Sequence, residues 1–201
     1  MELFAVFETW HLGDGNYPPP EKGQLVNLSF EVGPDELARA KGNPHPKFIH
    51  LGQAQYKFTG VVLRVYGRAN NSIVVLEADQ FCFYMNSQLA AKFAIGDVVT
   101  GRGTLLYDHY IWVEFLSRYP DPPDLFYKLR VSEIWQFRIP ERFITRSERG
   151  ITFPTRVEPN DYNPNDITSV DTVLDDSFVN YVVHFSDRDV PQGPIARTFC
   201  S

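Results

Sequence analysis

One segment of the chain has residue types and spacing that could bind calcium. Asp161, Asn163 and Asn165 stand at alternating positions, as the first oxygen ligands of a calcium-binding loop do. The sixth position of this segment is Asp166 instead of the glycine that the sharp turn requires, and the twelfth is Thr172 instead of a bidentate glutamate. We therefore interpret the segment as a solvated loop of Asx turns and predict no metal site.

The other residues capable of catalysis or cofactor binding lack the spacing of a known site. No HxH, HExxH or mixed Cys/His pattern links the histidines, which are His11, His45, His50, His109 and His184. The GDG and GRG segments lack the third glycine of a dinucleotide fingerprint and the Lys-Ser/Thr of a phosphate loop, and no GxSxG elbow is present. We predict no cofactor and lean towards a non-enzyme. An enzyme whose site leaves no motif remains an alternative.

The most suggestive candidates for binding are aromatic residues interleaved with arginines in the middle of the chain. If strands at 56–66 and 109–115 bury their aliphatic residues, the opposite parity displays Arg64, Tyr66, Tyr110 and Trp112, with Tyr84 and Arg102 nearby. Exposed side chains of these types stack nucleobases and pair with phosphates, and they also form hot spots of protein interfaces. A third interpretation is that the N-terminal strands or residues 127–139 cover this face and turn it into a second layer of core.

A second candidate surface is a basic tract in the last third of the chain. Its members are Lys128, Arg130, Arg138 and Arg142, and it continues to Arg149. Such charges can lie on a solvent-exposed strand face, where they prevent pairing with other chains. They can also contact phosphates or an acidic partner, so both interpretations stay open.

Period-two alternation predicts strands over most of the middle third. The segments are YKFTGVVLRVYG, SIVVLEA, QFCFYM, IGDVVTGRGTLLY and HYIWVEFLS. Asn70 and Asn71 tolerate the left-handed backbone of a tight hairpin between the first two strands. Ser87 is a suitable N-cap for a short helix before the fourth strand. In the first strand, the residues expected to point inward are Val61, Leu63 and Val65, and in the last strand they are Ile111, Val113 and Phe115.

The order strand, strand, strand, short helix, strand, strand over residues 56–117 resembles the OB-fold, a five-stranded partly open barrel. Gly60, Gly101 and Gly103 fit the sharp bends of a sheet that closes on itself. The resemblance is to a fold and not to a specific family, and it implies a binder of single-stranded nucleic acid or oligosaccharide. Another antiparallel barrel or a sandwich remains open.

The flanking segments predict further strands. Residues 3–11 and 23–32 are expected to form an N-terminal hairpin, and Pro34 with Asp35 marks the start of a short helix. After the proline-rich residues 118–124, alternation over 127–139 and 178–185 predicts a C-terminal β extension. Glu133 interrupts the apolar parity, which indicates a bulge.

We therefore predict a mainly β, single-domain protein over residues 1–201. An antiparallel OB-like barrel occupies 56–117, a hairpin and short helix occupy 1–55, and a strand with an acidic, loop-rich extension occupies 118–201. Its 201 residues are 43% hydrophobic and 14% aromatic, which is enough for a packed core.

Charge and cysteine usage narrow the expected partner and compartment. The net charge of −6 works against diffuse nucleic-acid binding, which depends on neutralising phosphates. Cys82 and Cys200 lie far apart, and no apolar run approaches the ~20 residues of a membrane span, so we expect free thiols and a cytoplasmic protein with no membrane contact. The favoured function is a non-enzymatic module that binds a protein partner, with an inhibitor or immunity-type role. The main alternative is the OB-like binder of single-stranded nucleic acid or oligosaccharide.

Overall fold

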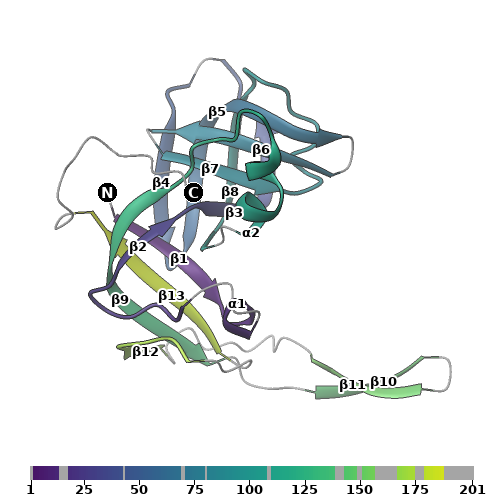
Figure 1. The fold of residues 1–201 in the computed structure, drawn as a ribbon. Helices are drawn as coiled ribbons and strands as arrows, with labels where there is room; N and C mark the ends of the chain where they lie inside the picture. Colours follow the sequence, from purple (N-terminus) through teal and green to yellow (C-terminus); the bar gives the residue numbers. More distant parts are fainter. Residues whose placement is uncertain are drawn as a thin grey trace.

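The computed structural model describes residues 2–13, 18–42, 44–68, 71–79, 81–107, 110–138, 143–148, 151–156, 167–174 and 179–187. This part of the chain is mainly β, as predicted, with a few short helical turns (Figure 1). The elements are β1 (Glu2–Glu8), α1 (Trp10–Gly13), β2 (Leu25–Leu28), β3 (Phe30–Arg39), β4 (Lys47–Gly52), β5 (Gln55–Arg68), β6 (Asn71–Ala78), β7 (Phe81–Asn86), β8 (Val98–Tyr107), α2 (Tyr110–Glu114), the 3₁₀ helix η1 (Leu116–Arg118), β9 (Tyr127–Arg138), β10 (Phe143–Glu148), β11 (Ile151–Arg156), β12 (Ile167–Val170) and β13 (Val179–Ser186).

Five strands close into a barrel, seen in the upper part of Figure 1. β5, β6 and β7 form an antiparallel meander, and the hairpin expected near Asn70 is confirmed by the pairing of Arg68 with Asn71. β7 runs parallel to β3, β3 pairs antiparallel with β8, and β8 pairs with β5 to complete the ring. The predicted β barrel is therefore confirmed, and four of its strands come from the predicted region.

The fifth strand of the barrel is not the one that the sequence predicted. The strand expected over 109–115 is wrong, because Tyr110–Glu114 form helix α2. The place beside β8 and β7 is already filled by β3, which comes from the N-terminal region. Trp112 of α2 and Leu116 of η1 are both buried, so two successive helical turns bury a large apolar pair.

The N-terminal strands also differ from the prediction. β1 pairs with β13 over seven positions and with β8, not with β2 or β3, so the expected hairpin is not formed. The helix expected from Pro34 is wrong, because β3 continues to Arg39 with a bulge between Pro34 and Glu36. A bulge accommodates a proline that cannot donate to the ladder, and the long pairing with β8 outweighs a helix of one or two turns.

The segment after Ser87 forms turns instead of the predicted helix. Ser87 Oγ accepts a hydrogen bond from the N–H of Leu89 at 3.2 Å, as a helix cap would, but the chain does not continue as a helix. Ala90 and Phe93 are buried as expected, whereas Leu89 is exposed. Six residues are too few to offset the cost of helix nucleation when turns bury the same two side chains.

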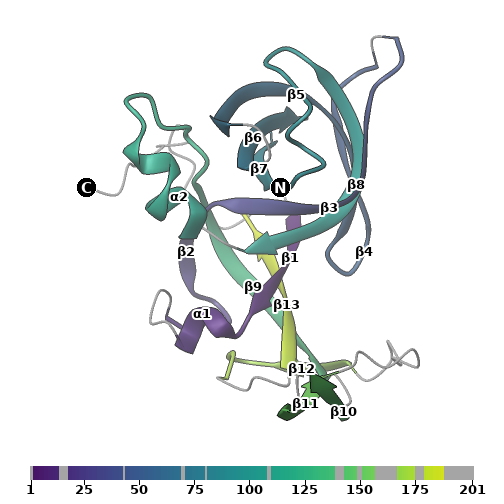
Figure 2. The same cartoon turned by 90° about the vertical axis from the view of Figure 1, so that its right-hand side faces the viewer.

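A second circuit of strand pairings shares β3 and β8 with the barrel. Only Ser29 separates β2 from β3, and β2 pairs with β9, β9 with β13, β13 with β1, and β1 with β8. Figure 2 shows β1, β9 and β13 below the barrel. The predicted C-terminal β extension is confirmed. β12 pairs with β9, and within the described ranges β10 and β11 pair only with each other.

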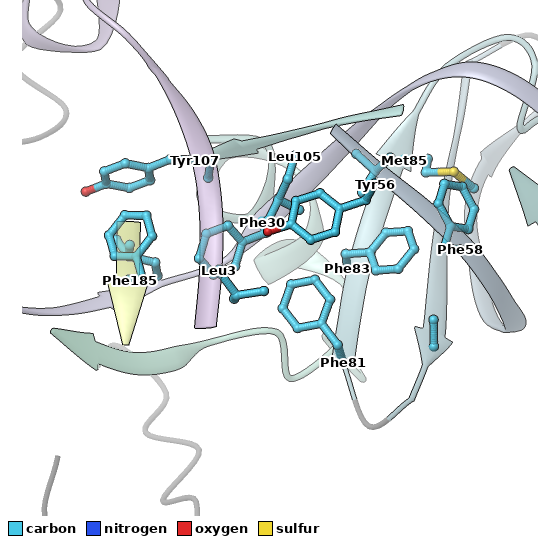
Figure 3. Close-up of a cluster of buried hydrophobic side chains, with 14 of the residues drawn as sticks. Leu3, Phe30, Tyr56, Phe58, Phe81, Phe83, Met85, Leu105, Tyr107 and Phe185 are labelled. Atoms are coloured by element: carbon cyan, nitrogen blue, oxygen red, sulfur yellow. The ribbon is translucent and has the colours of Figure 1, made fainter. Parts of the chain in front are cut away.

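One hydrophobic cluster fills the space enclosed by both circuits (Figure 3). Phe30 of β3 lies at its centre, with ring centroids 5.7 Å from Phe81 of the barrel and 5.8 Å from Phe185 of β13. All three side chains are buried, and each contributes roughly 1.5–3 kcal/mol by leaving water. The barrel and the extension are therefore packed on a common core.

Bulges decide which side chains of the long strands are buried. The register of β5 with β6 shifts between Val62 and Arg64, so Val62 and Val65 pack in the main cluster while Leu63 faces a second cluster. The expectation that Val61, Leu63 and Val65 share the interior is therefore wrong, because one extra residue reverses the parity.

The bulge expected near Glu133 in β9 is confirmed. The register with β13 shifts between His184 and Phe185, opposite Glu133 and Val131. Val131 is buried before the shift and Ile134 after it, so both parities of β9 reach the core in turn. None of the helices in the described part of the chain has the length and hydropathy needed to cross a lipid bilayer.

Candidate functional site

Residues 110–126, which we call the cap, cover one side of the barrel. The cap contains α2, η1 and the extended residues that lead to β9. Under it lies a separate cluster of buried side chains, to which β5, β6 and β7 contribute Tyr66, Ile73, Val75, Cys82 and Tyr84, and the cap contributes Trp112, Leu116, Leu125 and Phe126. The cap therefore turns the outer face of β6 and β7 into a second layer of core.

Aromatic packing and hydrogen bonds stabilise the cap. The rings of Trp112 and Phe126 meet edge to face with centroids 4.8 Å apart. Trp112 Nε1 donates to the carbonyl oxygen of Pro123 at 2.8 Å, so the indole is buried without losing its hydrogen bond. This bond joins the helix to the extended part of the cap.

Tyr66 and Arg64 of β5 attach the barrel to the cap at Asp121. The Tyr66 hydroxyl donates to the Asp121 carbonyl oxygen at 3.1 Å, and the Arg64 guanidinium lies 3.3 Å from the Asp121 carboxylate. Burial raises the pKa of Tyr66 above its usual value, while the nearby Arg64 charge acts in the opposite direction. The phenol is thus a neutral donor at physiological pH.

Five of the six predicted binding residues lie in the cap or against it, namely Arg64, Tyr66, Tyr84, Tyr110 and Trp112, but three of them are not exposed. Tyr66, Tyr84 and Trp112 are buried, so the expectation that they display their rings to solvent is wrong. The interpretation of a covered face is the one the structure supports, although the cover comes from the cap and not from the N-terminal strands or residues 127–139. Trp112 and Leu116 would share one face in a strand as well as in a helix, so their spacing could not have indicated the helix.

The outer surface of the cap exposes apolar and aromatic side chains. Phe115 and Tyr119 are 51% and 39% exposed and, with Arg118, line a shallow hollow of about 240 Å³. Tyr110 and Val113 are also exposed, on α2. We call these five residues the cap surface; of them only Tyr110 was predicted as a binding residue, because the strand prediction placed Val113 and Phe115 inside.

The two arginines at the cap are each paired with a carboxylate. Arg118 lies 2.9 Å from Glu114, one helical turn earlier, and Arg64 lies 3.3 Å from Asp121. Both pairs are largely solvent-exposed, so each contributes about 0–1 kcal/mol to stability. The cap surface therefore presents aromatic and aliphatic groups with nearly balanced charge.

The remaining candidates lie elsewhere. Arg102 is exposed on β8, where it stands opposite Lys57 of β5 and Glu36 of β3. In the basic tract Lys128 is exposed, and Arg130 donates to the carbonyl oxygen of Gly23 at 2.7 Å.

Two further members of the basic tract receive little or no description. Only the backbone of Arg138 is described, and Arg142 lies outside the described residues, as do Asp161, Asn163, Asn165 and Cys200. Within the described ranges, no three His, Cys, Asp or Glu residues are grouped as a metal ion would require.

Comparison with known proteins gives no relative. The chain matches no protein-family model, no curated protein sequence and no solved structure.

Proposed function

We propose that this protein is a non-enzymatic binding module that engages a protein partner through the cap surface. The observation that carries the proposal is that the chain covers the outer face of β6 and β7 with its own residues and exposes Phe115 and Tyr119 outside that cover. A cytoplasmic location and an inhibitor or immunity-type role remain part of the proposal.

The OB-like interpretation of the barrel strengthens this choice. In OB domains the face of the second and third strands binds oligonucleotides or oligosaccharides. If the meander β5, β6 and β7 corresponds to the first three OB strands, that face is the one under the cap. Tyr66 and Tyr84 are then unavailable for stacking on bases or sugars, which weakens the nucleic-acid and oligosaccharide alternatives.

The composition of the cap surface fits a protein partner. Tyrosine, phenylalanine and arginine are enriched at protein interfaces, and aromatic anchors dominate their energetics. Nucleic-acid binding instead requires cations that neutralise phosphates, and both Arg64 and Arg118 are already paired. The expected partner presents an apolar projection with little net charge, sized for the hollow between Phe115 and Tyr119.

Site-specific crosslinking tests the proposal. A photoreactive phenylalanine analogue is placed at Phe115 and, as the control, at Leu174, which is also an exposed apolar residue. In extracts of the native host, we expect one protein to crosslink at position 115 and not at 174. The purified partner should bind Phe115→Ser and Tyr119→Ser at least ten-fold more weakly than wild type, and Leu174→Ser equally well.

Two outcomes would count against the proposal. One is equal crosslinking at both positions, which would indicate non-specific contact. The other is quenching of tryptophan fluorescence by single-stranded oligonucleotides with a steep salt dependence, which would favour the nucleic-acid alternative.

A further inference from the structure

Strand β4 forms an edge of the main sheet. It pairs with β5, and no strand among the described residues pairs with its other side. Figure 2 shows the β4 hairpin at the right of the molecule, away from α2. The unpaired N–H and C=O groups of an edge strand are a template for another strand.

Aromatic contacts hold β4 rigidly in place. Phe48 stacks on Tyr56 with centroids 4.3 Å apart, and His50 stacks on Phe4 at 4.3 Å with an interplanar angle of 3°. Phe4 in turn stacks on His184 of β13 at 4.4 Å. A strand fixed in this way is already ordered before a partner arrives, which lowers the entropic cost of binding.

The middle of β4 lacks the charged side chains that normally protect an edge. Pro46 and Lys47 lie at its start, and the register shift between His50 and Gly52 places Leu51 in a bulge at its end. Ile49 in the regularly paired part and Leu51 in the bulge are 43% and 48% exposed. Two aliphatic side chains at an accessible edge favour aggregation unless a specific partner covers them.

The outer face beside β4 is locally basic. Lys57 of β5 stands directly opposite Ile49 and, on its other side, opposite Arg102 of β8, and both charged residues are exposed. Arg102 also stands opposite Glu36 of β3, whereas the two cross-strand neighbours of Lys57 are Ile49 and Arg102, so an acidic group beside Ile49 would stabilise Lys57. Residues 30–107 contain eight Lys and Arg against six Asp and Glu, although the whole chain has a net charge of −6.

We propose that β4 binds an extended segment of another protein as an added β-strand, and that the outward-facing residues of this segment are aliphatic and acidic. Main-chain hydrogen bonds to β4 supply affinity, as in other cases of strand addition. Aliphatic residues of the segment lie beside Ile49 and Leu51, and acidic residues lie near Lys47 and Lys57. The site is separate from the cap surface and does not depend on the function proposed for it.

Synthetic peptides test the proposal by fluorescence anisotropy. The probe is the labelled peptide ETVTETV, whose alternate positions carry Glu and Val on one face, compared with KTVTKTV and with ETVPETV, in which proline interrupts the strand. We expect ETVTETV to bind at least ten-fold more tightly than either control, and less tightly as salt rises. Hydrogen–deuterium exchange should slow at residues 47–52 when the peptide binds. The net negative charge of the protein alone would favour KTVTKTV, so tighter binding of that peptide would overturn the proposal.

Matched variants locate the binding site. Ile49→Ser and Leu51→Ser remove exposed aliphatic side chains without adding charge, so the fold should persist while peptide binding weakens at least ten-fold. Leu25→Ser, at a similarly exposed leucine of β2, is the control and should bind as wild type does.

The proposal fails if millimolar ETVTETV does not bind or leaves exchange at residues 47–52 unchanged. It also fails if the protein forms a dimer at low concentration that Ile49→Ser abolishes, because the occupant of β4 would then be a second copy of this chain.

Discussion

The outer faces on two sides of the barrel differ in their exposure to solvent. β6 and β7 are buried on both faces, from Ser72 to Leu76 and from Phe81 to Met85, and the cap covers them. β8 alternates between buried and accessible residues, with Arg102 on its open face. Strands buried on both faces have nearly continuous hydrophobic sequences, whereas half-buried strands alternate. The hydrophobic runs SIVVLEA and QFCFYM thus require a cover that VVTGRGTLLY does not.

The largest expected effect tests the covered side. Trp112→Ala removes a buried ring, its edge-to-face contact with Phe126 and its hydrogen bond to Pro123. We expect a loss of about 3–5 kcal/mol in the free energy of unfolding, measured with urea. Val113→Ala, at the exposed neighbouring position, should cost less than about 1 kcal/mol. A small loss for Trp112→Ala would mean that the cap contributes little to the fold.

The second prediction concerns Tyr56, which is buried on the side of the barrel that the cap does not cover, and the stability of the protein at alkaline pH. Burial raises the pKa of Tyr56 to about 12, against the weaker opposing effect of the hydrogen bond from the Phe4 N–H. An unfolded tyrosine ionises near pH ~10, so the unfolded state loses its proton first. The contribution to stability is therefore full below about pH 10 and is lost as pH rises to 12, by about 1.4 kcal/mol per pH unit.

The variant Tyr56→Phe isolates this effect. We expect it to cost about 1 kcal/mol at neutral pH, where the hydrogen bond to Phe4 is lost, and to flatten the decline between pH 10 and 12. Burial raises the pKa of Tyr107 as well, so part of the decline should remain. Unfolding curves of both proteins that fall in parallel above pH 10 would contradict the assignment.

The third prediction tests the packing of β8 against β3. A Cβ at Gly103 would lie 2.4 Å from the carbonyl oxygen of Gly33 and 2.9 Å from Cα of Pro34. We expect Gly103→Ala to destabilise the protein by about 1–3 kcal/mol, because backbone atoms must move. Gly33→Ala is the control, since its Cβ would meet nothing closer than 3.6 Å. Equal thermal stability of the two variants would show that β3 and β8 can separate without cost.

The smallest effect is expected at the polar attachment of the cap. Arg64→Gln removes an exposed ion pair with Asp121 and should cost less than about 1 kcal/mol, with the difference reduced by salt. Together with the tryptophan variant, this would show that apolar burial and not charge pairing stabilises the covered side. A loss above about 2 kcal/mol from Arg64→Gln would reverse that conclusion.

Local patterns were sufficient to predict most strands. The β5–β6 hairpin, the last strand β13 and the bulge near Glu133 follow from alternation and from residues that interrupt it. The place of β3 in the barrel could not be predicted from its own residues, because its pairing with β7 and β8 joins segments that are distant in the chain. The side chains of β5 that face the core could not be predicted either, since no residue type near Leu63 indicates the bulge that reverses their alternation.

The candidate site was predicted in composition but not in exposure. Arg64, Tyr66, Tyr84 and Trp112 meet at the cap, because they belong to the same side of the barrel. Residues 109–115 have an alternating pattern that also fits a short helix, so period alone did not separate the two. Because we predicted a strand, we expected Phe115 in the core and did not predict the surface that Phe115 forms with Tyr119.

The pairing of β1 with β13 has a consequence for synthesis of the protein. Glu2 lies opposite Ser186 and Glu8 opposite Asn180, so β1 cannot form this pairing until β13 has been synthesised. At ordinary rates of translation, the synthesis of Tyr181 follows that of Phe7 by about 10 to 35 s. During that interval β1 can pair with β8 but not with β13, and chaperones that bind nascent apolar segments would find Phe7 accessible.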